Sequence, residues 1–227
     1  MSSKNYLSIY AKSFNWAGFF LPKKTYKNCS YLYDFCRVVD NIADDEDEIE
    51  IKKIKFQKFV SDFKQKNFED PVIQNMWNII HEFNISLEII YDLFDGIESD
   101  IKQNVKIDTR KDLLIYCYRV AGTVGLMMAK ILKVSKKQSL KSAIDLGIAM
   151  QLTNISRDVI EDSKKNRSYI DRNFEEINST IKLADTFYKN SFYSIREIPL
   201  SFRFSILVAR RVYRKIGYKI LKKKTFE

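Results

Sequence analysis

Four side chains able to do chemistry recur along residues 33–44 at the spacing of one helix face. Tyr33, Arg37, Asp40 and Asp44 follow one another at steps of four, three and four residues, so they line one stripe of a helix with 3.6 residues per turn. Two carboxylates four residues apart on a helix repel each other. A cation bound between Asp40 and Asp44 would turn that repulsion into a binding site.

A second stripe of the same kind lies on residues 151–162. Gln151, Asn154, Asp158 and Asp162 follow at steps of three, four and four residues, with apolar Leu152, Ile155, Val159 and Ile160 between them. Charged groups in such a core-like region need a partner or a metal ion. Carboxylate and amide oxygens without His or Cys suit Mg²⁺ bound to phosphate oxygens, with Mn²⁺ as the second candidate. Such ions would neutralise the charge that builds on a departing diphosphate.

Both stripes also have a purely structural interpretation. Either stripe alone is more often the charged surface of an ordinary helix, and Arg37 and Arg157 would then be ion-pair partners of the neighbouring aspartates. The presence of both stripes favours the metal site. A di-iron four-helix protein is a further alternative, but that class uses Glu-x-x-His pairs, and the chain has a single histidine, His81.

The elements that must position these stripes are helices, and the spacing of apolar residues predicts an all-α fold. Glycine and proline number only 6 and 3 among 227 residues, too few for the tight turns of a many-stranded sheet. Pro22, Pro71 and Pro199 fall at predicted helix starts, where a missing N–H costs little. The length fits one domain, 1–227. The helices are expected at about 3–16, 23–45, 49–66, 71–82, 86–104, 109–133, 136–163, 175–195 and 200–222.

The charge of the chain is basic but dispersed. Lys and Arg number 39 against 29 Asp and Glu, a formal net charge of +10, which is compatible with nucleic-acid, membrane-surface or diphosphate binding. The lysines are spread along the whole chain, so a solvated Lys-rich surface is the favoured interpretation. No basic and aromatic recognition motif occurs, and we expect no nucleic-acid partner.

Composition also bounds the compartment. The first ten residues lack the apolar region of a signal peptide, and no run of 18 apolar residues occurs, so we expect a cytoplasmic protein. The three cysteines form no C-x-x-C pair and indicate neither a disulfide framework nor a zinc site. Peripheral membrane contact is left open, because the surface is basic while no amphipathic anchor is clear.

Four motifs carry a resemblance to a known family. Tyr33 to Asp44 matches Y-x-x-C-R-x-x-D-D-x-x-D with one departure, Asn41 for the second Asp. Residues 151–162 match Q-x-x-N-x-x-R-D-x-x-E-D, residues 116–125 match Y-C-Y-x-V-A-G-x-V-G, and residues 13–22 are similar to S-F-x(6)-L-P. On these residues the chain resembles the phytoene/squalene synthase family of head-to-head prenyltransferases, from about residue 8 to 170 and more loosely from 185 to 218.

The resemblance implies an isoprenoid synthase-type helical bundle with a central cavity, and it assigns roles to residues. The implied metal ligands are Asp40, Asp44, Asn154, Asp158 and Asp162. The implied catalytic side chains, which stabilise a carbocation or hold diphosphate, are Tyr33, Arg37, Tyr116, Arg157 and Tyr213. The implied substrate contacts are Lys12, Ser13, Arg37, Val120, Gly122, Gly125, Gln151 and Arg157. For the two glycines, close helix packing is the alternative, and it is compatible with lining a tunnel.

The resemblance also implies a reaction, most like that of a bacterial phytoene synthase. Two C20 geranylgeranyl diphosphates would be joined to phytoene through a cyclopropylcarbinyl diphosphate, with no NADPH expected, because no glycine-rich nucleotide motif occurs. The alternatives are squalene, dehydrosqualene or hydroxysqualene synthesis from C15 farnesyl diphosphate, and a noncatalytic assembly factor. The segment 166–170 lacks the Gly and Pro of the family's G-R-x-Y-L-P, which predicts a domain shortened after the second Asp-rich motif. We expect a monomer or weak dimer.

Overall fold

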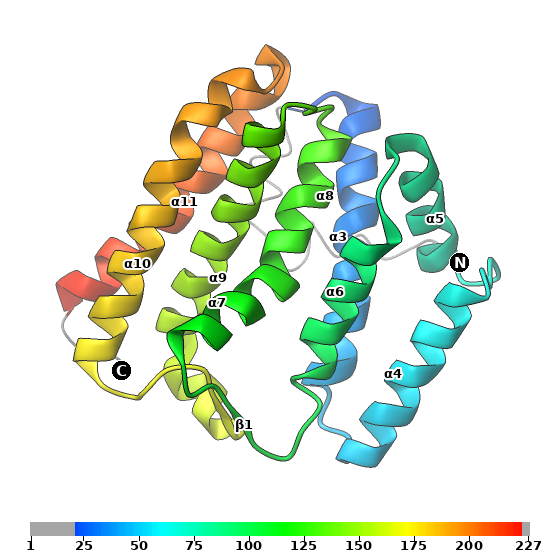
Figure 1. Ribbon diagram of the computed structural model, residues 1–227. Helices are drawn as coiled ribbons and strands as arrows, with labels where there is room; N and C mark the ends of the chain where they lie inside the picture. Colours follow the sequence, from blue (N-terminus) through cyan, green and yellow to red (C-terminus); the bar gives the residue numbers. More distant parts are fainter. Residues whose placement is uncertain (1–20, 224–227) are drawn as a thin grey trace.

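Helices make up nearly all of the described chain. The computed structural model describes residues 21–223, and its helices pack side by side in one bundle (Figure 1). A five-residue π-helix, η1 (Tyr118–Gly122), joins α7 to α8, and a 3-10 helix, η2 (Tyr193–Glu197), follows α10. The all-α prediction is confirmed. The α-helices are α3 (Lys23–Asp44), α4 (Ile49–Lys64), α5 (Pro71–Phe83), α6 (Leu87–Glu98), α7 (Arg110–Cys117), α8 (Thr123–Ile131), α9 (Lys137–Lys164), α10 (Phe174–Phe192) and α11 (Leu200–Lys223).

Side-chain caps explain why three helices begin within one residue of the predicted starts. Asp70 caps α5 by accepting from the Val72 N–H at 2.8 Å. Thr109 and Asn173 cap α7 and α10 in the same way, each accepting from the N–H three residues on. A cap of this kind satisfies one of the N–H groups that a helix start leaves unpaired.

Three predicted helices differ from those observed. The helix expected at 86–104 ends at Glu98, where the Ser99 hydroxyl donates to the Gly96 carbonyl at 2.6 Å and the chain then turns. The helix expected at 109–133 contains η1, a π-helical turn that periodicity does not reveal. The helix expected at 175–195 ends at Phe192 and tightens into η2. The predicted helix 3–16 lies outside the described residues.

The centre of the bundle is α9, which packs against α8, η1, α10 and α11 (Figure 1). One hydrophobic cluster, which includes Phe35, Phe63 and Phe94, joins α3 to α6 and α8. A second, which includes Leu152 and Tyr188, joins α9 to α10. The run from α7 to α8 is long and apolar enough to cross a membrane, but it packs against α6 and α9 as a core helix.

A short parallel bridge connects two loops that are distant in sequence. Strand β1 (Val105–Lys106), after α6, pairs with β2 (Arg167–Ser168), after α9. The Val105 N–H donates to the Asn166 carbonyl at 3.0 Å, and the Ile107 N–H donates to the Ser168 carbonyl at 3.0 Å. The bridge therefore holds the chain that follows the second acidic stripe against the chain that follows α6.

Candidate active site

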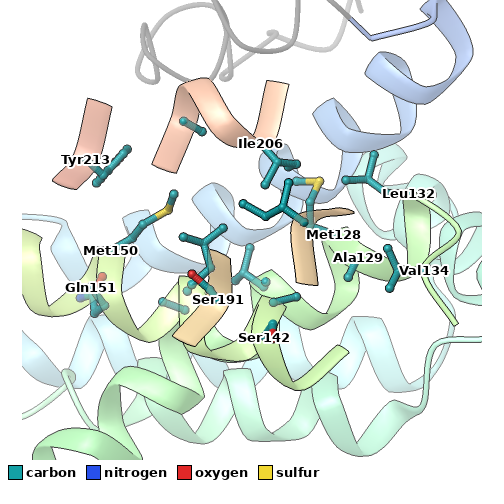
Figure 2. A pocket seen from close by; sticks show the side chains of 18 of the residues that line it. Met128, Ala129, Leu132, Val134, Ser142, Met150, Gln151, Ser191, Ile206 and Tyr213 are labelled. Carbon is teal, nitrogen blue, oxygen red and sulfur yellow. The ribbon is translucent and has the colours of Figure 1, made fainter. Parts of the chain in front are cut away.

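An apolar cavity of about 300 Å³ lies between α3, η1, α8, α9, η2 and α11. Aliphatic and small side chains line most of it, and Tyr33, Gln151 and Asn154 supply polar groups at one place. Figure 2 shows Gln151 and Tyr213 at one side of the cavity, and Leu132 and Val134 at the other. The wall also includes four serines, Ser139, Ser142, Ser191 and Ser194. A predominantly apolar cavity with a few polar groups is typical of a small-molecule site, and the aliphatic lining suits a hydrocarbon chain.

A smaller, more polar cavity of about 190 Å³ adjoins the apolar one. Its wall includes Arg37, Asp40 and Tyr116. The two cavities share the side chains of Tyr33, Cys36, Val120 and Gln151. The cavity with charged side chains therefore lies next to the apolar cavity, and the two are lined in part by the same residues.

Arg37 of the first stripe and Arg157, next to the second stripe, are each paired with a neighbouring aspartate. Arg37 Nη1 lies 2.6 Å from Asp40 Oδ2. Arg157 donates from Nε and Nη2 to the two carboxylate oxygens of Asp158, both at 2.6 Å. The ion pairs weighed as the structural interpretation are therefore present. They do not exclude contact with a diphosphate, because Arg37 also lines the polar cavity.

The last carboxylate of the first stripe is held by residues that follow the second stripe. Arg167 Nη1, on β2, lies 2.6 Å from Asp44 Oδ1, and Lys165 Nζ lies 3.5 Å from the same oxygen. Burial by itself would raise the pKa of the Asp44 carboxyl, but the hydrogen bond and the charge of Arg167 lower this pKa below its usual value. Arg167 was not among the predicted site residues, although its segment was noted as a departure from the family pattern.

A buried carboxylate between the two stripes was also missed from the sequence. Asp100 is 8% exposed and accepts hydrogen bonds from the Tyr116 and Tyr169 hydroxyls, both at 2.7 Å. The two tyrosine rings stack, with centroids 4.7 Å apart. Asp100 lies within the predicted helix 86–104, where it resembles any other acidic residue, so no local signal singled it out.

Negative charge on the two stripes is only partly compensated. Burial, followed by the neighbouring Asp44 carboxylate, raises the pKa of Asp40 to about 6. Burial and then the Asp158 carboxylate raise the pKa of Asp162 to about 7. The charge of Asp100 raises both pKa values and that of Arg167 lowers both. The two stripes therefore face shared neighbours, and their surplus negative charge suits them to bind cations.

The donor set fits a hard divalent ion. Within residues 21–223, no three His, Cys, Asp or Glu side chains already lie close enough together to hold a metal ion. The buried Oδ1 of Asn154 has no hydrogen-bond partner, although an amide oxygen in that position needs one. An oxygen-only set with one vacant amide acceptor is the chemistry that Mg²⁺ prefers.

The remaining predicted residues are distributed as follows. Tyr213, on α11, Val120 and Gly125 line the apolar cavity. Gly122 is buried, and a Cβ there would meet Tyr118 and Ile144 rather than the cavity. Lys12 and Ser13 lie outside the described residues.

Comparison with known proteins agrees with this geometry. Residues 7–174 match the family described as squalene/phytoene synthase. A phytoene synthase of Pseudescherichia vulneris is 29% identical over 92% of this chain and 78% of its own length. A 4,4'-diapophytoene synthase of Staphylococcus haemolyticus is 32% identical over 79% of this chain and 67% of its own.

Solved structures show the same fold. A dehydrosqualene synthase in complex with ligand superposes with a TM-score of 0.76 at 26% identity, covering 97% of this chain and 85% of that one. The squalene synthase HpnC from Alicyclobacillus acidocaldarius superposes with a TM-score of 0.81 at 17% identity, covering 95% of this chain and 90% of that one. The expected isoprenoid synthase-type bundle is confirmed.

Proposed function

The chain belongs to the squalene/phytoene synthase family, and on that premise we propose that it joins two prenyl diphosphates head to head. The observation that carries the proposal is the shared wall of the two cavities, formed by Tyr33, Cys36, Val120 and Gln151. A prenyl diphosphate has the same two-part character, with an anionic head and a long apolar tail. Its head would lie against the acidic stripes and its tail in the apolar cavity.

The head would be held by divalent ions and by arginines. Asp40, Asp44, Asn154, Asp158 and Asp162 would hold Mg²⁺, which neutralises charge on the diphosphate when it is bound. Arg37 and Arg157 now pair with aspartates beside this site and would donate hydrogen bonds to diphosphate oxygens when the substrate is bound. A planar guanidinium group can donate two parallel hydrogen bonds to such oxygens. Outside the described residues, Lys12 and Ser13 would add further contacts to the head.

The tail and the reacting carbons would lie along the tyrosines. Tyr33 lines both cavities, Tyr116 lines the polar one, and Tyr213 lines the apolar one. A ring face can stabilise an allylic carbocation, and a tyrosine hydroxyl can direct proton loss. Gly125 lines the apolar cavity, so the tail would pass beside it.

Two geranylgeranyl diphosphates giving phytoene, without NADPH, is our first choice of reaction. The relatives include phytoene synthases, a 4,4'-diapophytoene synthase and a presqualene diphosphate synthase of Sinorhizobium fredii, so C15 farnesyl diphosphate is the second. We also propose a single domain across 1–227, shortened after the second stripe, acting as a cytoplasmic monomer or weak dimer.

A substrate assay tests the proposal. The purified chain is given C15 or C20 diphosphate with Mg²⁺, with Mn²⁺ and with EDTA, each with and without NADPH. We expect a C40 product from the C20 substrate that needs the metal and not NADPH. A C30 hydrocarbon with no C40 product would replace the first choice by the second. No condensation under any condition would favour the noncatalytic alternative.

A further inference from the structure

The excess positive charge of the chain is concentrated at the end of the bundle remote from the acidic stripes. Three segments form that end, at the top of Figure 1: 21–27 at the start of α3, 130–141 between α8 and α9, and 189–203 around η2. They hold 11 Lys and Arg residues and one acidic residue. The rest of the sequence has 28 basic and 28 acidic residues. We call these three segments the basic end.

Acidic side chains at the basic end are already compensated. Glu197 pairs with Lys136, which ties η2 to the start of α9. Glu82, at the end of α5, pairs with Lys24 at 2.7 Å. Other cations there remain exposed to solvent, among them Lys23, Lys133, Lys137 and Arg196.

The same end presents large apolar side chains to solvent. Leu200 is 77% exposed and Tyr193 is 73% exposed, more than any other large apolar side chain in residues 21–223. Between them in sequence, Ile195 and Ile198 line the apolar cavity. One short segment therefore forms a wall of the cavity and also exposes apolar groups outward. Phe192, 46% exposed, packs against Tyr193 with ring centroids 5.9 Å apart, and exposed apolar side chains that gather in this way are typical of an interaction surface.

The apolar cavity ends beneath the basic end. Gln151 and Tyr213 mark its polar side, while Leu132 and Val134 mark its other side (Figure 2). Leu132 and Val134 belong to segment 130–141 of the basic end. The cavity thus extends from the acidic stripes toward the face that carries both the cations and the exposed apolar groups.

We propose that the basic end docks on an anionic lipid bilayer. Tyr193 and Leu200 would enter the interface between headgroups and acyl chains, and the surrounding lysines and arginines would lie on anionic headgroups, the two contributions that drive interfacial binding. An acidic protein would match the cations but would not account for an apolar cavity ending under the same face. A bilayer accounts for both, because a prenyl tail would pass between lipid and cavity over a short path. That last link rests on the proposed function, and the docking does not.

Vesicle flotation of the full chain, without substrate, tests the docking. We expect flotation with vesicles of phosphatidylcholine and phosphatidylglycerol, little flotation with phosphatidylcholine alone, and release at high salt. Lys137→Glu combined with Arg196→Glu should lower the partition coefficient at least about tenfold, because each basic residue near an anionic surface contributes to binding. Tyr193→Ser combined with Leu200→Ser should lower it by a similar factor at every salt concentration.

Matched variants elsewhere on the surface serve as controls. Ile54→Ser removes an apolar side chain that is 65% exposed on α4, and Lys102→Glu with Lys111→Glu reverses two exposed charges away from the basic end. Both should bind vesicles as the wild type does. Equal binding to neutral and anionic vesicles, or wild-type binding by both basic-end variants, overturns the proposal.

Two further outcomes separate this proposal from others. In the first, the wild type binds no vesicles and sediments as a dimer, and Tyr193→Ser with Leu200→Ser converts it to a monomer. This result overturns the docking and indicates that a second copy of the chain covers the basic end. A protein that binds anionic vesicles through these residues but condenses no diphosphate supports the docking and overturns only the proposed function.

Discussion

The Tyr116 hydroxyl donates a 2.7 Å hydrogen bond to Oδ2 of the buried Asp100 carboxylate. Oδ1 of the same group accepts from Tyr169 at 2.7 Å, and the two hydroxyls are 3.1 Å apart. Tyr116 lines the polar cavity, whereas Asp100 lies behind Tyr116 and lines neither cavity. Asp100 therefore orients a candidate catalytic tyrosine and links it to the loop that carries Arg167.

Asp100→Asn should impair turnover more than folding. Unlike the carboxylate, the amide NH₂ group cannot accept a hydrogen bond, so one tyrosine hydroxyl must redirect its proton and accept instead, which we expect to cost about 1–3 kcal/mol of unfolding free energy. A displaced Tyr116 ring should lower kcat about 10- to 100-fold, since small misplacements of reacting groups are costly. Urea unfolding and steady-state kinetics measure the two effects.

A second tyrosine–aspartate pair gives the control. The Tyr118 hydroxyl donates to Asp92 Oδ2 at 2.7 Å, on the outside of α6. Asp92→Asn should leave kcat within about twofold of wild type, because this pair is away from both cavities and partly solvated. Equal losses of kcat in the two variants would show that Asp100 has no special relation to the site.

Gly125→Ala and Gly147→Ala should each destabilise the bundle. A Cβ on Gly125 would lie 2.3 Å from the Ala143 carbonyl oxygen, and one on Gly147 would lie 2.2 Å from the Ala121 carbonyl oxygen. Backbone atoms cannot move aside as a side chain can, so α9 must separate from α8 in the first variant and from η1 in the second. We expect a loss of about 1–3 kcal/mol, in the range for overpacking, measured by urea unfolding.

Gly217→Ala is the matched control for the helix crossing. A Cβ at Gly217 meets only side-chain atoms, the nearer being Ile181 Cγ2 at 3.2 Å. The higher helix propensity of alanine, about 1 kcal/mol, should offset this contact. A loss at Gly217 as large as that at Gly147 would argue against the backbone clash as the cause.

The sequence predicted the parts of the site that lie on regular helices. Tyr33, Arg37 and Asp40 could be placed on one face because the 3.6-residue period holds throughout α3. Asp100, Arg167 and Tyr169 could not, because loops and the β1–β2 bridge bring them together from positions more than 60 residues apart. Tertiary pairing of this kind leaves no local period for a sequence reading to detect.

The glycines show the same limit inside a helix. Gly122 and Gly125 were both predicted to contact substrate or a neighbouring helix. Both glycines lie against α9, but only Gly125 also lines the apolar cavity, and substrate contact remains a prediction. Gly147, which lies on the α9 side of this helix contact, was overlooked. The π-helical turn at η1 changes the phase between α7 and α8, so the face that each glycine occupies could not be read from spacing alone.

Asp185→Asn should destabilise the protein at neutral pH and lose that effect in acid. Burial by itself would raise the pKa of the Asp185 carboxyl. Hydrogen bonds from Arg214, Lys189 and Tyr218 outweigh burial and lower the pKa to about 2. A lowered folded-state pKa gives stability that is present above the unfolded value of about 3.9 and is lost as pH falls toward 2. We expect a difference of about 1–2 kcal/mol in urea unfolding at pH 7, after allowance for solvent screening, that shrinks below pH 4.

The exposed Asp171 provides the comparison for this pH dependence. At each pH from 7 to 3, Asp171→Asn should have the same urea midpoint as the wild type. The reason is that Asp171 is exposed and surface charges contribute little to stability. If the Asp185→Asn difference stayed constant down to pH 3, the ion pair with Arg214 would not be its source.

Asn154→Leu should separate ion binding from folding. The buried Oδ1 of Asn154 has no hydrogen-bond partner, and its amide nitrogen makes only a long 3.5 Å contact to Gln151. Replacing an unsatisfied buried group by an apolar one of similar size costs little or stabilises. The free energy of unfolding should therefore stay within about 1 kcal/mol of wild type, while the rise in Tm on adding Mg²⁺ with inorganic diphosphate should disappear.

Thr180→Val makes the same kind of change away from the acidic stripes. The Thr180 hydroxyl, on α10, is also buried without a partner, so its removal should be equally tolerated, but the Tm response to Mg²⁺ and diphosphate should remain. Loss of the response in both variants would mean that it reports general packing. A retained response in Asn154→Leu would mean that the vacant amide oxygen is not a metal ligand, and the stripe would then bind its cation through carboxylates alone.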